Sequence, residues 1–219
     1  MEKRIRLCAA LAMVLLLTAC GQAPAEHERE ERLTVVATVF PAYDFARAAG
    51  GELAEVRLLL PPGAESHSYE PTPADILAVQ ECDLFLYLGG ESDAWVETIL
   101  ESVDMQGEAL RMVDCVDLLE EETVEGMEDH EGHDHDHAEG PGLGEVVGYD
   151  EHVWTSPKNA AAITRRFGEE LAALDSAHGA QYRANAEAYA AQIDALDQKF
   201  HDFFDALPDR TIVFGDRFP

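Results

Sequence analysis

Basic residues are scarce in this sequence. Lysine and arginine together number 15, against 44 aspartates and glutamates, and the 219-residue chain carries a formal net charge of -29. Such a surface repels phosphates on nearly every face, which argues against a nucleic-acid partner. Because 47% of the residues are hydrophobic, the chain is not a disordered polyanion and can fill one or two ordinary cores. Cations are therefore its natural partners.

Familiar catalytic motifs are missing as well. The sequence contains no H-E-x-x-H pair, no G-x-S-x-G turn and no P-loop. A metal-dependent hydrolase, in which an open coordination position holds a water molecule, is the alternative from the enzyme class. No general base for such a reaction is evident, so the sequence favours binding over catalysis.

The apolar run at the N-terminus is short. It covers residues 7–17 and follows a basic segment that contains Lys3, Arg4 and Arg6. A run of this length cannot span a bilayer as a stable anchor, whereas a basic segment, a short apolar run and small residues in this order are typical of an export signal. We therefore predict a signal peptide over residues 1–19.

The signal ends in the stretch LTAC, which resembles the lipobox of bacterial lipoproteins. In that motif the signal is cleaved before the cysteine, here Cys20, and the cysteine is lipidated. The polar residues 20–32 suit a tether to such an anchor. We expect an exported protein held by lipid on the outer face of the cytoplasmic membrane; an ordinary signal peptide with a chance cysteine is the alternative.

Cysteine is scarce too. Besides Cys20, only Cys82 and Cys115 remain once the signal is removed. An exported pair could form a disulfide. However, Cys82 precedes a predicted strand and Cys115 follows the next one, which places them at opposite ends of parallel neighbours, too far apart for a bridge. We predict two free, mostly buried thiols.

From Leu33 onward, β-rich runs alternate with helical patterns. Predicted strands cover residues 33–40, 54–62, 83–90 and 109–113, and predicted helices cover residues 41–51, 71–82 and 93–103. This alternation predicts an α/β fold, with a parallel sheet wrapped by helices, in a lobe over residues 33–175. Ligands of such sheets bind beyond the carboxyl ends of the strands, so the loops there are the places to search.

Two of these loops carry a histidine in a braced setting. His67 lies between a proline-glycine turn and a helix start marked by Thr72, and His152 lies just before Ser156 and Pro157, a second cap and first-turn pair. A histidine fixed in this way has already lost the freedom that metal binding would cost it. Imidazole nitrogen suits zinc, copper, nickel and, less strongly, manganese.

Three acidic residues flank these loops. Glu65 could add an oxygen ligand beside His67, whereas Glu70 and Asp150 could accept the second imidazole N–H of a metal-bound histidine. Ordinary surface charge is the alternative for Glu70 and Asp150.

A long helix is predicted over residues 176–208. Its apolar residues step by alternating fours and threes: Tyr182, Ala186, Tyr189, Ile193, Leu196, Phe200, Phe203 and Leu207. The stretch from about residue 180 to residue 206 spans roughly 40 Å at 1.5 Å per residue, more than one small lobe needs, so we expect the helix to bridge two bodies. A shorter helix with one apolar face precedes it, and we expect the aromatic residues of both helices to lie in a core.

An acidic segment rich in histidine covers residues 120–139. It holds ten acidic residues and four histidines but no lysine or arginine, so it cannot pack a core and should be a loop. The histidines are His130, His133, His135 and His137. Neutral imidazoles two or three residues apart can share a metal ion, and the acidic field attracts cations. We expect the loop to collect zinc weakly; a solvated acidic loop without a metal role, or a histidine tag, are the alternatives.

Three motifs together resemble a known family. They are PPGAESHSYEPTP around His67, DEHVWTSP around His152 and the LTAC lipobox. In this combination they look like the metal-binding lipoproteins of bacterial ABC importers, the zinc and manganese receptors of the ZnuA and TroA kind. The resemblance extends from about residue 33 to residue 219. The resemblance implies two α/β lobes joined by one long rigid helix. It also implies a metal ion held between the lobes by three histidines and a carboxylate, the first two histidines being His67 and His152.

The sequence departs from this family at residues 209–219, the expected start of the second lobe. The family's third histidine would fall in the stretch TIVFGDRFP, where Gly215 or Arg217 occupies the place. Asp216 is the nearest candidate ligand, and a salt bridge with arginine is its alternative role. A fragment of a longer protein and a shortened relative both fit this ending.

The resemblance also implies a function without bond chemistry. An exported monomer would capture a divalent ion, Zn²⁺ with Mn²⁺ as the alternative, and pass it to the permease of an ABC transporter. A surface adhesin on the same fold is an alternative from another class. His27, His178 and His201 lie outside the motifs, and we expect them to be exposed or structural.

Overall fold

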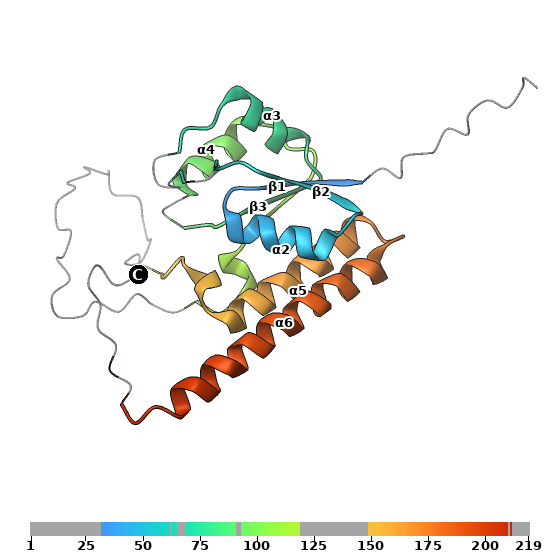
Figure 1. The fold of residues 1–219 in the computed structure, drawn as a ribbon. Helices are drawn as coiled ribbons and strands as arrows, with labels where there is room; N and C mark the ends of the chain where they lie inside the picture. The colour runs from blue at the N-terminus through green and yellow to red at the C-terminus, as the bar shows by residue number, and fades with distance from the viewer. Residues whose placement is uncertain are drawn as a thin grey trace, which may run out of the picture. The chain divides into compact units, whose positions relative to one another are not determined.

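Four parallel strands form one sheet in the order β2-β1-β3-β4 (Figure 1). The computed structural model describes residues 32–61, 63–64, 69–90, 93–118, 149–209 and 211. The strands are β1 (Leu33–Ala37), β2 (Ala54–Leu58), β3 (Leu84–Tyr87) and β4 (Glu108–Arg111). Val35 of β1 lies opposite both Val56 and Leu84. The predicted parallel α/β fold is confirmed.

Helices cover both faces of the sheet. Figure 1 shows α2 (Phe40–Gly50), α5 (Pro157–Leu174) and α6 (Gly179–Asp205) on one side, and α3 (Pro73–Glu81) and α4 (Ala94–Ser102) on the other. Two short 3-10 helices, η3 (Val113–Cys115) and η4 (Val153–Thr155), lie in the connections.

Strand side chains alternate between these two layers. In β3 all four residues are buried. Leu84 and Leu86 pack with Phe167 of α5, whereas Phe85 packs with Val96 of α4. Successive residues of a strand point to opposite faces, so a strand covered on both faces is apolar throughout. This is the pattern that the sequence shows over residues 83–90.

The turn between α5 and α6 is fixed by hydrogen bonds around one carboxylate. Asp175 Oδ2 lies 2.7 Å from His178 Nδ1 and accepts a hydrogen bond from the fully buried Tyr182 hydroxyl at 3.0 Å. Burial opposes ionisation of Asp175, but these hydrogen bonds outweigh it and hold its pKa below the usual range. His178 is therefore structural, and His201, 3.6 Å from Asp197, is exposed, as the sequence suggests for both.

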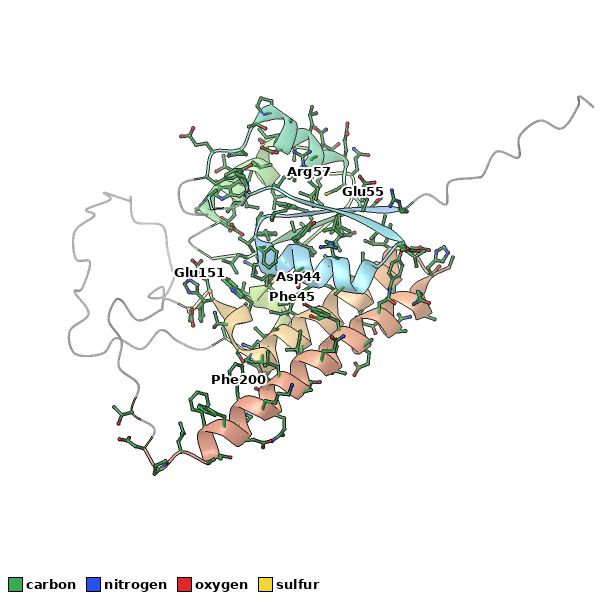
Figure 2. The ribbon with its side chains drawn as sticks, viewed as in Figure 1. Asp44, Phe45, Glu55, Arg57, Glu151 and Phe200 are labelled. Carbon is green, nitrogen blue, oxygen red and sulfur yellow. The ribbon has the colours of Figure 1, made fainter. Side chains whose placement is uncertain are left out.

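The C-terminal part of α6 does not lie in a core, so the prediction that the aromatic residues of this helix are buried is wrong there. Leu196 and Phe200 are each 46% exposed and Phe203 is 60% exposed, although the spacing places them on the same apolar seam as Tyr182. Figure 2 shows Phe200 near the end of α6 that points away from the sheet. The helix packs against α2 and α5 only over its first part, and its buried residues stop at Ala190. Periodicity reveals an apolar face but not whether anything covers it. Leu174 at the end of α5 is exposed for the same reason.

Both remaining cysteines are free thiols, as predicted. Cys82 is buried, and burial raises the pKa of its thiol to about 11. Cys115 is only half-buried, and desolvation raises the pKa of its thiol to about 12. Both thiols are therefore protonated at neutral pH.

Several predicted segments lie outside the described residues. They are the signal peptide (1–19), the tether as far as residue 31, the acidic loop (120–139) and residues 212–219, which include Asp216. Within the described part of the chain, no helix combines the length and apolarity needed to cross a membrane.

Candidate metal centre

One buried carboxylate joins two strand ends at the carboxyl edge of the sheet. Asp93, at the start of α4, is 1% exposed. Its Oδ2 accepts hydrogen bonds from the backbone N–H groups of Leu88 and Gly89, which follow β3, and from the hydroxyl of Thr38, which follows β1. Burial raises the pKa of Asp93 despite these donors. Asp93 thus fixes the turn after β3 and ties it to the end of β1.

The segment that carries His152 rests on this turn. A Cβ added at Gly90 would lie 2.8 Å from the Cβ of Glu151, closer than such atoms approach. Only glycine fits this contact. Figure 2 shows Glu151 on the side of the molecule where α2 begins, after the end of β1. Because Glu151 directly precedes His152, this contact places His152 at the carboxyl end of β3.

His152 is held twice by Asp150. The Asp150 Oδ1 atom accepts the backbone N–H of His152 at 2.9 Å and lies 3.0 Å from the ring Nδ1. The ring also packs against Trp154, with centroids 5.4 Å apart, and the side chain is 41% exposed. Nδ1 is engaged by a carboxylate, so Nε2 is the ring atom that can bind a metal ion. A carboxylate in this place orients the ring and increases the basicity of the nitrogen that binds metal.

The start of α5 fixes the other side of His152. Ser156 is the N-cap and its hydroxyl accepts the N–H of Asn159 at 3.5 Å, while Pro157 occupies the first turn. The Thr155 hydroxyl donates to the His152 carbonyl at 2.8 Å. The helix behind this cap is buried in the core. The predicted bracing of this loop is therefore present.

The loop that carries His67 leaves the carboxyl end of β2 and ends at α3. Thr72 and Asp75 form a complete capping box, in which the side chain of each accepts a hydrogen bond from the backbone of the other. Arg57 of β2 donates to Asp75 Oδ1 at 2.6 Å, so the downstream end of the loop is joined to the strand from which the loop begins. The strands are parallel, so this loop and the His152 segment open onto the same edge of the sheet.

The candidate ligands are only partly covered by the structure. His67, Glu65, Asp216 and the four histidines of the acidic loop lie outside the described residues, and Glu70 is exposed. In the part of the chain that the structure describes, no three histidine, cysteine, aspartate or glutamate side chains form a group that could hold a metal ion. The candidate centre therefore consists, so far, of His152 with Asp150 as its carboxylate partner.

Sequence reasoning missed Gly90 and Asp93. An aspartate before a helix is normally interpreted as an N-cap, yet the Asp93 side chain makes no cap hydrogen bond and turns back to the end of β3 instead. The glycine pair after a buried strand was the available signal for a close backbone approach.

A family model described as the periplasmic component A of a zinc-uptake complex, ZnuA, matches residues 35–218. This match covers β1 from Val35 onward, the other three strands, all five described α-helices and the His152 segment. It therefore includes both histidine loops.

Relatives and a solved structure agree with this match. The zinc-binding lipoprotein AdcA of Streptococcus pneumoniae serotype 4 is 29% identical over 212 residues, which are 96% of this chain and 40% of AdcA. The high-affinity zinc uptake system protein ZnuA of Bacillus subtilis is 31% identical over 194 residues, which are 86% of this chain and 58% of that protein. The Zn(II)-bound ZnuA-like domain of S. pneumoniae AdcA superposes with a TM-score of 0.61 and 27% identity, covering 78% of this chain and 55% of the domain. The chain thus spans about half the length of the proteins it matches.

Proposed function

The chain belongs to the ZnuA family of zinc-uptake components, and from this premise we propose that it captures Zn²⁺ outside the cytoplasmic membrane and delivers it to an ABC importer. The observation that carries the proposal is the pairing of His152 Nδ1 with Asp150 at 3.0 Å. This pairing leaves Nε2 for a metal ion at the edge of the sheet where ligands of this fold class bind. The names of the relatives, a zinc-binding lipoprotein and a zinc uptake protein, support zinc as the ion.

His67 and His152 are the two ligands that we propose first. Each would bind through a neutral imidazole, with Asp150 and Glu70 as acceptors for the second ring nitrogen. Glu65 or Asp216 would add an oxygen. Nitrogen ligands favour Zn²⁺ over Mn²⁺, which prefers more oxygen. The ion is cargo, bound and released unchanged, and the family consists of metal-binding solute-binding proteins that are not enzymes. A hydrolase is therefore not proposed.

The acidic loop would act before the tight site. His130, His133, His135 and His137 are interleaved with acidic residues, which attract divalent cations and hold them only weakly because the loop must be ordered to bind. Such a loop raises the local Zn²⁺ concentration near the edge of the sheet. It does not need to supply a ligand to the tight site.

Delivery would take place at the outer face of the membrane. Lipid on Cys20 would hold the protein there, with residues 20–32 as a tether, and a monomer would pass its ion to the permease. A second lobe joined through α6 would shield the bound ion. No observation among the described residues favours the adhesin alternative, and we do not propose it.

The test is a single substitution in the full-length natural protein. His152→Ala removes the Nε2 ligand and should abolish the tight Zn²⁺ binding event, measured by competition with a chelator of known affinity. His67→Ala should do the same. His201→Ala is the matched control, because His201 also lies near an aspartate but is exposed on α6, and it should leave binding unchanged. Wild-type affinity in His152→Ala would disprove the assignment.

A further inference from the structure

The loop that carries His67 is closed at its base by a tyrosine. The Tyr69 hydroxyl lies 3.3 Å from the carbonyl oxygen of Leu59, ten residues upstream, and 2.9 Å from Asp75 Oδ2. Leu59 directly follows β2 and is buried. The single phenolic proton therefore lies between an acceptor at the start of the loop and an acceptor beyond its end.

The carboxylate that receives this proton is rigidly held. Asp75 is 6% exposed. Its Oδ2 also accepts the Thr72 hydroxyl at 2.6 Å and the Thr72 N–H at 3.0 Å, while Oδ1 accepts from Arg57 at 2.6 Å. Figure 2 shows Arg57 on the side of the sheet covered by α3. Asp75 is part of α3 and is bonded to β2, so it does not move with the loop. Its hydrogen bond therefore fixes the position of the Tyr69 hydroxyl relative to β2 and α3.

The ring of Tyr69 is held independently of its hydroxyl. It packs edge-on against Trp95 of α4, with centroids 5.1 Å apart and an interplanar angle of 63°. Burial and the hydrogen bond to Asp75 raise the pKa of Tyr69 to about 12, so the phenol stays protonated at physiological pH. Replacement of Tyr69 by phenylalanine would therefore remove the hydrogen bonds of the hydroxyl and leave the ring packing against Trp95 in place.

We propose that Tyr69 is a positioning residue for metal capture, whose hydroxyl fastens the base of the His67 loop before an ion arrives. The inference rests on the proposed function, because it assumes that this loop supplies a ligand. A loop whose two ends are already joined loses less conformational entropy when its histidine binds an ion. Tyr69 touches no metal and acts through the loop. Tyr69 therefore increases the affinity of the protein for the ion without being one of its ligands.

The experiment compares two tyrosines in the full-length natural protein. Tyr69→Phe should weaken Zn²⁺ binding about three- to tenfold, the effect of one hydrogen bond. Tyr189→Phe is the matched control. It removes a tyrosine hydroxyl that donates to Asp44 Oδ2 at 2.5 Å and joins α6 to α2, on the side of the sheet opposite α3 (Figure 1). Chelator competition gives the Zn²⁺ affinity, and thermal unfolding of the metal-free proteins gives the stability loss of each variant.

The outcomes separate the two proposals. Weaker binding in Tyr69→Phe alone, with similar losses of Tm in both variants, supports the positioning role. Equal affinities in Tyr69→Phe and wild type, with tight binding abolished by His67→Ala, would overturn that role and leave the proposed function standing. An equal loss of affinity in Tyr69→Phe and Tyr189→Phe would also overturn it, because the effect would then be general destabilisation. Tight binding that survives His67→Ala would disprove the ligand assignment itself.

Discussion

Asp150 and His152 are joined by two hydrogen-bond contacts to one oxygen. Asp150 Oδ1 lies 2.9 Å from the backbone nitrogen of His152 and 3.0 Å from its ring Nδ1. This arrangement fixes the position of the chain and the orientation of the ring together. With Nδ1 as the donor, the lone pair for a metal ion is on Nε2.

Removal of this carboxylate should weaken zinc binding without abolishing it. In Asp150→Ala the ring loses its acceptor, and we expect the affinity for Zn²⁺ to fall about 10- to 100-fold, as is usual for carboxylate partners of histidine ligands. Isothermal titration or chelator competition measures the change. Asp197→Ala removes a similar partner from the exposed His201 and should have no effect. Unchanged affinity in Asp150→Ala would show that His152 does not bind the ion through Nε2.

A methyl group at Gly90 should displace the His152 segment. Gly90→Ala forces Glu151 away, and we expect a loss of about 1–3 kcal/mol in the free energy of unfolding, as in other overpacked contacts, together with weaker Zn²⁺ binding. Gly107→Ala is the control. Gly107 directly precedes β4, at the opposite edge of the sheet, and an added Cβ would lie 2.3 Å from the carbonyl oxygen of Asp83, which precedes β3. This variant should destabilise the fold but leave affinity intact. Equal affinities in both variants would contradict the placement of His152.

Deletion of residues 120–139 should separate the two proposed kinds of zinc site. The deletion removes the four clustered histidines with ten acidic residues, so we expect the weak binding events to disappear and the tight event to remain. Zinc titration with a weak and a strong competing chelator distinguishes the events. A variant in which only the four histidines become asparagine keeps the acidic residues and tests the contribution of charge. Loss of the tight event on deletion would reverse the roles of the loop and of His152.

Stability at low pH should depend on Asp75. Burial opposes its ionisation, but hydrogen bonds from Thr72 and Tyr69 and the charge of Arg57 together hold its folded-state pKa below the ordinary value. The stabilisation is therefore fully present above about pH 4, the unfolded-state range for aspartate, and is lost as the pH falls through the lower folded-state pKa. Asp75→Asn should lose about 1–3 kcal/mol of unfolding free energy at pH 7, and its difference from wild type should shrink in acid. Urea unfolding at several pH values measures this, and a constant difference down to pH 2 would contradict it.

The parts of the fold that were predictable from sequence depend on local signals. Thr72, and Ser156 with Pro157, mark helix starts within a few residues of chain, and both starts are where they were expected. The buried strand β3 is equally clear from its composition. Such features need no knowledge of distant segments.

The parts that were missed depend on contacts between distant segments. The fit of Gly90 against Glu151 joins residues 61 positions apart, and the link from Tyr69 to Leu59 crosses the loop. No period or cap encodes these contacts. The exposed Phe200 shows the converse case, in which a clear apolar pattern predicts burial that the described residues do not provide. The approach of His67 to His152 remains a prediction.

The placement of the two indole rings gives the protein two built-in optical probes. The chain has two tryptophans; Trp95 contacts Tyr69 at the base of one ligand loop, and Trp154 contacts the His152 ring in the other. Fluorescence emission from each indole reports on a different loop. Replacement of either tryptophan by phenylalanine leaves a single indole, so the order in which the two loops respond to an arriving ion can be followed through tryptophan emission by stopped-flow without an added dye.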